Sequence, residues 1–308
     1  FAQKFRLDIA DLETAMDGKV EKLVCYQKVG GETLERLFSG MVWDALVQLP
    51  VNKRMRWGSN RVEFVRPVRW IVMLFNTRVV LGNFPEHPQF GRETRGHRFH
   101  CDRSLTITSP AAYKKILAEE GKVIADFAER RENIRDQVVS AGKKIGGKAV
   151  IDNDLLDEVA ALVEWPVALS GRFEDRFLSV PQEALISTMR ENQKYFHVVD
   201  DQGKLMPYFI TVANIESTDP AQVIAGNEKV IRPRLSDAAF FFETDKKKTL
   251  DEHREKLKTV VFQAQLGTVF DKTERIAKLA GFIAGKLGAD KILTERAGQL
   301  SKADLATA

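Results

Sequence analysis

The stretch from Pro181 to Lys248 constrains the fold of this 308-residue chain more than any other part. It contains two apolar runs of the kind that form strands, and the polar tract 200–204, which includes Gly203, lies between them. Apolar runs that flank a short glycine-containing tract predict a β-hairpin. The second run, Leu205 to Ile215, is long enough to cross a hydrophobic core.

The same stretch ends in a predicted helix. Pro233 directly precedes the helical pattern, and a proline suits the first turn of a helix because its missing N–H would have no partner there. The helix is therefore expected to run from about Leu235 to Lys248. Three consecutive phenylalanines, 240–242, cover more than one helix face, which predicts burial between two bodies, as at a domain junction.

The remaining patterns alternate between helix and strand. An apolar repeat at positions i, i+3 and i+4 predicts a four-turn helix over 32–49, which Pro50 ends. Further helices are expected over 110–120, 126–145 and 153–163, and strands over 22–29, 67–75, 79–81, 105–108 and from 167 onward. The fold class that this order predicts is α+β, with a mixed or antiparallel sheet domain over 1–245, a helical insertion around 110–163 and an all-helical region over 246–308.

Positive charge is concentrated in the segment 51–104. The whole chain carries a formal net charge of +4, whereas this segment holds eleven Arg or Lys and four Asp or Glu, a net +7. Ten of the eleven cations are arginine, whose planar guanidinium can form two parallel hydrogen bonds to a phosphate. A surface that contacts nucleic acid and a solvated face with scattered ion pairs both fit this pattern.

Cysteine usage and hydropathy indicate the kind of compartment in which the protein works and whether it spans a membrane. Cys25 and Cys101 offer no disulfide framework, which favours a reducing compartment. The longest uninterrupted apolar run, Trp70 to Phe75, is far too short to span a membrane, and no signal peptide pattern is present. The chain begins with Phe1 and ends within a helical pattern, so it is expected to be an internal piece of a longer protein.

Motifs that carry catalysis are not evident in the sequence. It contains no GxxxxGK phosphate loop, no GxSxG elbow and no HExxH metal site. His97, His100 and Cys101 have the spacing of metal ligands, but zinc normally takes four ligands and no second His or Cys cluster exists to complete them. Cys101 could pair with either histidine as a nucleophile, although nothing marks it as activated. No metal and no catalytic residue are expected in this piece.

Several long motifs occur together in the chain. They are FVRPVRW at 64–70, RGHRF at 95–99, LVEWPVAL at 162–169, ISTMRENQKYFHVV at 186–199, LMPYFITVANIE at 205–216 and GNEKVIRPRLSDAAFFFETDKKK at 226–248. Together and in this order they resemble the β subunit of the bacterial two-chain glycyl-tRNA synthetase. The resemblance extends from about Gly30 to the last residue.

The resemblance implies a division of labour between two chains. In that family the α subunit carries the ATP-dependent, adenylate-forming site, and the β subunit is needed for tRNA binding and for assembly of an α2β2 complex. The chain would then be part of a glycine–tRNA ligase that acts on tRNA(Gly) in the cytoplasm, uses ATP through its α subunit and has no membrane partner. No cofactor is expected in this piece itself.

The resemblance also covers parts of the fold. The α+β part is similar, more distantly, to the editing-type module of the phenylalanyl-tRNA synthetase β chain, so hydrolytic editing of mischarged tRNA is one alternative function. A purely structural scaffold is another. The region from 246 onward resembles the start of an HD-type helical domain, but no histidine occurs from Lys258 to Ala308, so this piece lacks the ligands of an active HD phosphohydrolase.

Basic residues within and beside these motifs are the candidates for contact with tRNA. They are Arg66, Arg69, Arg95, His97, Arg98, Lys194, Arg232 and Arg234. The alternative for each is an ion pair at the end of a helix or strand.

Overall fold

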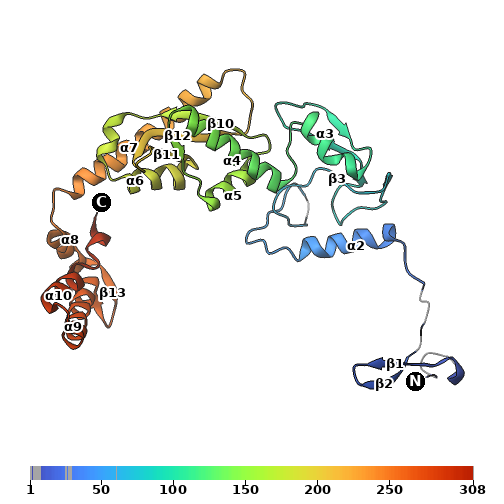
Figure 1. Cartoon of the computed structure of the whole chain (residues 1–308), viewed down its shortest axis with the longest axis horizontal. Helices are drawn as coiled ribbons and strands as arrows, with labels where there is room; N and C mark the ends of the chain where they lie inside the picture. Colours follow the sequence, from blue (N-terminus) through green and yellow to red (C-terminus); the bar gives the residue numbers. More distant parts are fainter. Residues whose placement is uncertain (1, 3–7, 25, 27–29, 60, 308) are drawn as a thin grey trace. The chain divides into compact units, whose positions relative to one another are not determined.

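A computed structural model of the chain describes residues 2, 8–24, 26, 30–59 and 61–307. The chain divides into two compact units, which can be followed by colour in Figure 1. The N-terminal unit consists of residues 1–94 and 104–113, and the C-terminal unit consists of residues 95–103 and 114–308. Cys25 and residues 27–29 of the strand predicted over 22–29 lie outside the described residues.

The N-terminal unit is built from short strand pairs and the helix α2 (Leu34–Val47), which confirms the helix predicted over 32–49. The strands in this part of the chain are β1 (Glu13–Asp17), β2 (Val20–Val24), β3 (Ile71–Val72), β4 (Leu74–Phe75), β5 (Arg78–Val79), β6 (Phe90–Gly91), β7 (Glu93–Arg95) and β8 (Ser104–Thr106). β3 and β6 pair in parallel, whereas β1 with β2 and β4 with β5 are antiparallel hairpins, and β7 pairs with β8. Short 3-10 helices occupy Ile9–Asp11 and Pro110–Ala112.

A small core packs α2 against the segment 71–90 of the N-terminal unit. Its buried residues are Met73, Val80, Phe84 and Phe90. One face of α2 packs against them through Phe38, Val42, Trp43 and Leu46. Asn76, with a φ of 54°, makes the turn from β4 to β5, so these two strands form a hairpin.

A four-stranded antiparallel sheet is the centre of the C-terminal unit. Its strands are β9 (Lys148–Ala149), β10 (Val167–Arg172), β11 (Phe196–Val199) and β12 (Leu205–Ala213), in the order β10-β12-β11-β9. β11 and β12 form the predicted hairpin, with Phe196 opposite Ile210. Gly203 has a φ of 78°, a left-handed conformation that glycine adopts at little cost, and this explains why the turn is there.

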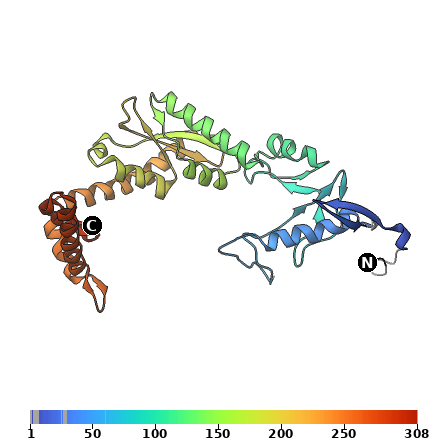
Figure 2. The same ribbon diagram turned by 60° about the horizontal axis from the view of Figure 1, so that its bottom comes forward.

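Helices cover both faces of this sheet (Figure 2). Adjacent strand residues point to opposite faces, so Ile210 packs in the cluster formed with α4 (Phe127–Lys144) and α5 (Asn153–Leu162). Phe209 packs in the other cluster, with α6 (Gln182–Ser187) and α7 (Pro220–Asp245). A 3-10 helix at Asp175–Ser179 and a π-helical turn at Thr188–Asn192 complete that second layer. The helix α3 (Tyr113–Glu119) precedes α4.

The predicted start of the helix near Leu235 is wrong. α7 begins at Pro220 and contains Pro233 in its interior, where a proline breaks one backbone hydrogen bond. Ile231 and Leu235, on either side of Pro233, are both fully buried, so packing against the sheet holds the helix through this point. The proline of the first turn is Pro220, with Asp219 as the N-cap.

The predicted burial of all three phenylalanines is also wrong. Phe240 is 63% exposed and Phe241 is 45% exposed. Phe242 packs with Leu235 and Ala239 because these residues recur at the spacing that lines one helix face. Consecutive residues on a helix point in different directions, so one packed face accommodates only one of the three rings.

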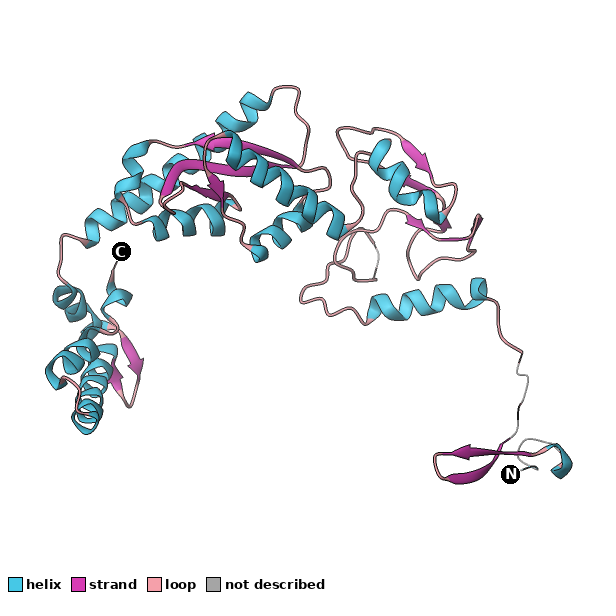
Figure 3. Ribbon diagram, in the orientation of Figure 1, coloured by secondary structure: helices cyan, strands magenta, loops and turns pink. Residues whose placement is uncertain are grey.

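The region after α7 is mostly helical (Figure 3). It contains α8 (Leu250–Lys256), a 3-10 helix at Leu257–Thr259, β13 (Val261–Gln263), β14 (Gly267–Thr268), α9 (Val269–Leu287), α10 (Lys291–Leu300) and a 3-10 helix at Ala303–Ala306. The hairpin of β13 and β14 corrects the prediction of an all-helical region. Gly267, with a φ of 81°, permits the tight turn before α9. The proposed boundary near residue 245 stays a prediction.

The structure therefore has the predicted mixed α and β character, with small and mainly antiparallel sheets. Among the described residues, no helix is both long enough and apolar enough to cross a membrane.

We expect Gly171→Ala to destabilise the C-terminal unit by about 1–3 kcal/mol, as overpacking of a core does. A Cβ at Gly171 would overlap the ring of Phe209, which is fully buried and stacked on Tyr195 at a centroid distance of 4.5 Å. Gly226→Ala, in α7 with open space around it, is the matched control and should be neutral or stabilising by up to about 1 kcal/mol. Urea unfolding curves measure both, and equal stabilities would contradict the packing described here.

Candidate nucleic-acid interface

The loop 95–103 is held to the C-terminal unit by its own backbone. The N–H of His97 donates to the carbonyl O of Gly121 at 2.7 Å, and the N–H of Cys101 donates to the carbonyl O of His97 at 2.9 Å. A Cβ at Gly96 would overlap the Gly121 backbone, so this close approach requires glycine. The RGHRF motif thus forms a tightly fixed turn.

The His97 side chain is buried beneath this loop and holds it in place through hydrogen bonds. Only 2% of it is exposed. Its Nδ1 accepts from the N–H of Phe99 at 3.2 Å, so Nε2 carries the proton and donates to the carbonyl O of Asn214 at 2.8 Å. His97 was predicted to contact tRNA, and this geometry instead suits a residue that positions the loop.

Asn214, just beyond β12, connects three segments that are far apart in the sequence. Its Oδ1 accepts from the N–H of Glu164 at 2.8 Å and from the N–H of Trp165 at 3.0 Å. Two residues later, the N–H of Glu216 donates to Nε2 of His100 at 3.0 Å. The motifs RGHRF, LVEWPVAL and LMPYFITVANIE therefore meet at one place. Sequence reasoning missed Asn214, because a lone asparagine at a strand end gives no local signal.

The outer side of this loop offers unpaired positive charge. Arg95 and Arg98 are exposed, and neither side chain has a hydrogen bond or ion pair to any described residue. Phe99 between His97 and His100 is 72% exposed. Arg103, at the other end of the loop, is neutralised by Glu120 at 2.5 Å. The loop can thus present two guanidinium groups and one aromatic ring to a partner.

Arg66 and Arg69 lie in the N-terminal unit, before β3, and both are exposed. Arg66 donates only to the carbonyl O of Val65, and Arg69 has no side-chain partner among the described residues. In the described part of the segment 51–104, ion pairs engage only Arg56 and Arg103. Most of the positive charge that the sequence concentrates here is therefore not neutralised.

Two of the other three candidates are in ion pairs. Lys194 lies 2.9 Å from Glu158, and Arg232 lies 2.5 Å from Glu174. Arg234 is exposed and lines a cleft of about 450 Å³ together with residues of α6, the π-helical turn and α7. For Lys194 and Arg232, the arrangement matches the alternative of an ion pair, although Arg232 lies in the interior of α7 and not at its end.

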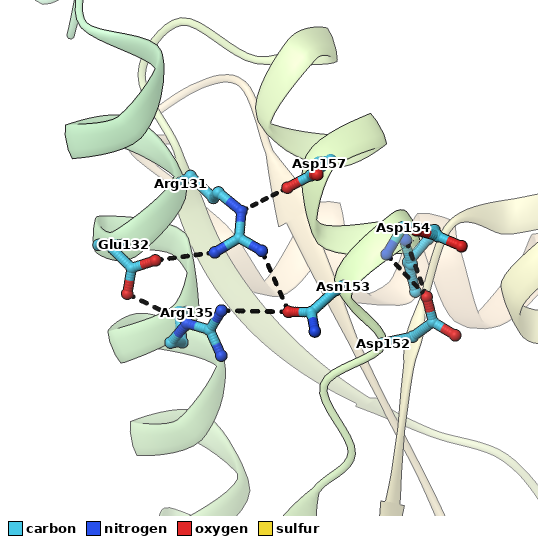
Figure 4. A network of polar contacts seen from close by, with 8 residues as sticks. Arg131, Glu132, Arg135, Asp152, Asn153, Asp154 and Asp157 are labelled. Carbon is cyan, nitrogen blue, oxygen red and sulfur yellow. Dashed lines mark hydrogen bonds and ion pairs between the residues drawn. The ribbon is translucent and has the colours of Figure 1, made fainter.

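Arginines of the helical layer are likewise satisfied within the protein (Figure 4). On α4, Arg131 pairs with Asp157 and Glu132 and donates to Asn153 at 3.1 Å. Arg135 pairs with Glu132 at 3.1 Å and donates to the same amide oxygen of Asn153 at 3.2 Å. This network ties α4 to the N-terminus of α5, so its charges serve the fold.

Two properties of the titratable groups of the described residues bear on catalysis, namely clustering as metal ligands and shifted pKa values. Among these residues, no group of three or more His, Cys, Asp or Glu side chains could hold a metal ion. Burial lowers the pKa of His197, and the charge of Asp152 partly opposes this. Burial raises the pKa of Tyr195 to about 12. The Tyr195 hydroxyl donates to Oδ1 of Asn227 at 2.6 Å, a contact that ties β11 to α7.

Comparison with known proteins identifies close relatives. The chain is 57% identical over 289 residues to the glycine–tRNA ligase beta subunit of Hahella chejuensis, a match that covers 92% of this chain and 41% of the relative. It is 53% identical over 312 residues to the protein of the same name from Marinobacter nauticus, which covers 100% of this chain and 44% of the relative. The chain spans less than half the length of these relatives.

These matches define the class of protein as a subunit of an aminoacyl-tRNA synthetase. A family model described as glycyl-tRNA synthetase beta subunit matches residues 1–308. The chain belongs to that family, and the family that its motifs resembled is confirmed.

We expect Asn214→Ala to loosen the place where the three motifs meet. The change removes an acceptor for two backbone N–H groups, which should cost about 1–3 kcal/mol in total. Asn214→Asp keeps an acceptor oxygen and is the control. Amide hydrogen exchange at Glu164 and Trp165 should accelerate in the alanine variant and stay slow in the aspartate variant, and similar rates in both would exclude this role.

The raised pKa of Tyr195 predicts a loss of stability at high pH. Its folded-state pKa of about 12 exceeds the usual value of 10.0. Above pH 10 the unfolded chain therefore releases the phenol proton while the folded chain retains it, so the free energy of unfolding falls between pH 10 and 12. Tyr195→Phe should show a shallower fall in urea unfolding over this range. The same fall in both proteins would refute the assignment.

Proposed function

We propose that this chain is part of a glycine–tRNA ligase and that its loop 95–99 contacts the phosphate backbone of tRNA(Gly). The single observation that carries the proposal is the exposed, unpaired pair of Arg95 and Arg98 on a loop fixed by His97 and Asn214. Family membership supports the class of reaction, since the relatives are named glycine–tRNA ligase beta subunits.

The fixed loop would reduce the cost of binding. The loop is already held, because the backbone N–H of His97 is bonded to Gly121 and the His97 side chain is bonded to Asn214. The loss of freedom when RNA binds would therefore fall mainly on the two arginine side chains. Guanidinium groups match phosphate geometry but read no base sequence. The loop would therefore contribute to affinity and orientation more than to the choice of tRNA. Arg66, Arg69 and Arg234 remain further candidates for contact.

The catalytic step is assigned to a second chain. We propose that this chain assembles with an α subunit in an α2β2 complex in the cytoplasm and that the α subunit uses ATP to activate glycine. This chain would then supply tRNA contacts but no catalytic residue and no cofactor site.

Two likenesses of the fold belong to the same proposal. We propose that the α+β part is related to the editing-type module of phenylalanyl-tRNA synthetase and that a helical, HD-like domain begins at about residue 246. The sheet with helices on both faces, and the largely helical region after α7, support these relationships.

The proposal is tested with Arg95→Ala and Arg98→Ala together in the full-length protein, assembled with the α subunit. The double variant should bind tRNA(Gly) more weakly, and the log–log salt dependence of binding should flatten by roughly 1.4–1.8 units for two lost phosphate contacts. ATP-dependent glycine activation should be unchanged. The control is Arg103→Gln with Glu120→Gln, which removes a neutral ion pair from the same loop. Unchanged tRNA affinity and salt dependence in the arginine variant would refute the proposal.

A further inference from the structure

The extended segment 70–75 has two apolar faces, and only one of them is used by the core. Ile71, Met73 and Phe75 belong to the core of the N-terminal unit. The alternate residues, Trp70, Val72 and Leu74, line a cleft of about 430 Å³. Successive side chains of an extended strand point to opposite sides, so this second face is built by the same alternation that builds the core.

The cleft combines two aromatic rings with a lining of both polar and apolar atoms. Its other lining residues are Thr94, Ile107, Pro110 and Tyr113. The indole N–H of Trp70 donates to Oγ1 of Thr94 at 3.1 Å, and Thr94 is buried, so the ring is held by a fixed partner. Trp70 is 42% exposed and Tyr113 is 37% exposed, and the Tyr113 hydroxyl has no hydrogen-bond partner among the described residues. Both rings are therefore accessible to a ligand.

The basic character of the chain segment that carries this cleft favours an anionic occupant. Residues 51–94 carry eight Arg or Lys and three Asp or Glu, a net +5, and residues 104–113 carry no charged side chain. A nucleotide of single-stranded RNA combines a planar apolar ring with an adjoining phosphate, which suits an aromatic cleft on a basic surface.

We propose that this cleft seats an unstacked base of the bound tRNA, with the base stacked on Trp70. The inference rests on the proposed function, since the occupant is the same RNA. The cleft volume of about 430 Å³ lies in the range of ordinary small-molecule sites. The base would stack through its uncharged ring. Because stacking releases no counterions, the affinity that it adds should not depend on the salt concentration.

The test compares Trp70→Leu with Trp70→Phe in the full-length protein assembled with the α subunit. Both variants lose the hydrogen bond to Thr94, but only the phenylalanine keeps a ring for stacking. Trp70→Leu should bind tRNA(Gly) roughly 5- to 150-fold more weakly than Trp70→Phe, the range for loss of one stacked base. The salt dependence of binding should be equal in the two. If Trp70→Leu does not fold, Tyr113→Leu against Tyr113→Phe makes the same comparison at a second lining residue.

Equal tRNA affinity of the leucine and phenylalanine variants overturns the inference. In that case the proposed function is still tested by the Arg95→Ala and Arg98→Ala double variant. That variant should change the salt dependence of tRNA binding, and it leaves the cleft intact. A Trp70→Leu protein that keeps its tRNA affinity but fails to assemble with the α subunit also overturns the inference, since the cleft would then seat a protein segment.

Discussion

The hydrogen bonds of Asn214 are the constraint on which the candidate interface depends. Its side chain and carbonyl bind the segments around Trp165 and His97, which are far from it and from each other in the sequence. Local preference for helix or strand cannot bring such segments together, because each is a loop without a regular series of backbone hydrogen bonds. The side-chain amide of Asn214 brings these segments together, because its one oxygen accepts from two N–H groups. The conformational entropy lost by Asn214 is small, since this residue directly follows a sheet strand. The positions of the exposed arginines of the loop therefore depend on Asn214, which holds the loop through His97.

Strand alternation has different consequences in the two units. In the C-terminal unit, Phe209 and Ile210 point to opposite faces, and helices cover both. In the N-terminal unit, Met73 reaches the core while Trp70 and Val72 face an open cleft that Pro110 and Tyr113 border. The same pattern of apolar residues thus gives a closed layer in one place and an accessible aromatic surface in the other. The two units differ in what covers the second face of the strand, whereas the alternation within the strand is the same.

Local chemistry explains which features the sequence could predict. The turn at Gly203 and the end of α4 near Gly146 follow from left-handed glycine, and both were predicted correctly. Pro233 inside α7 was not, because burial of the residues around it outweighs the local cost of a proline. The burial of His97 and the role of Asn214 also escaped prediction, since both arise from contacts between residues 49 to 117 positions apart. The basic character of segment 51–104 was visible in the sequence, whereas the pairing of each arginine was not.

Competition for carboxylates decides which arginines stay free. In segment 51–104, Glu93 accepts hydrogen bonds from the hydroxyl groups of Ser104 and Thr106, and Glu86 accepts from the backbone N–H of Arg61. These acids are thereby occupied by neutral donors and do not pair with nearby arginines. A surface with unpaired guanidinium groups attracts a polyanion, but salt screens this attraction beyond about 8 Å at physiological ionic strength. Binding by this chain would therefore need direct phosphate contacts, which weaken with salt, and apolar stacking, which does not, to hold RNA under cellular conditions.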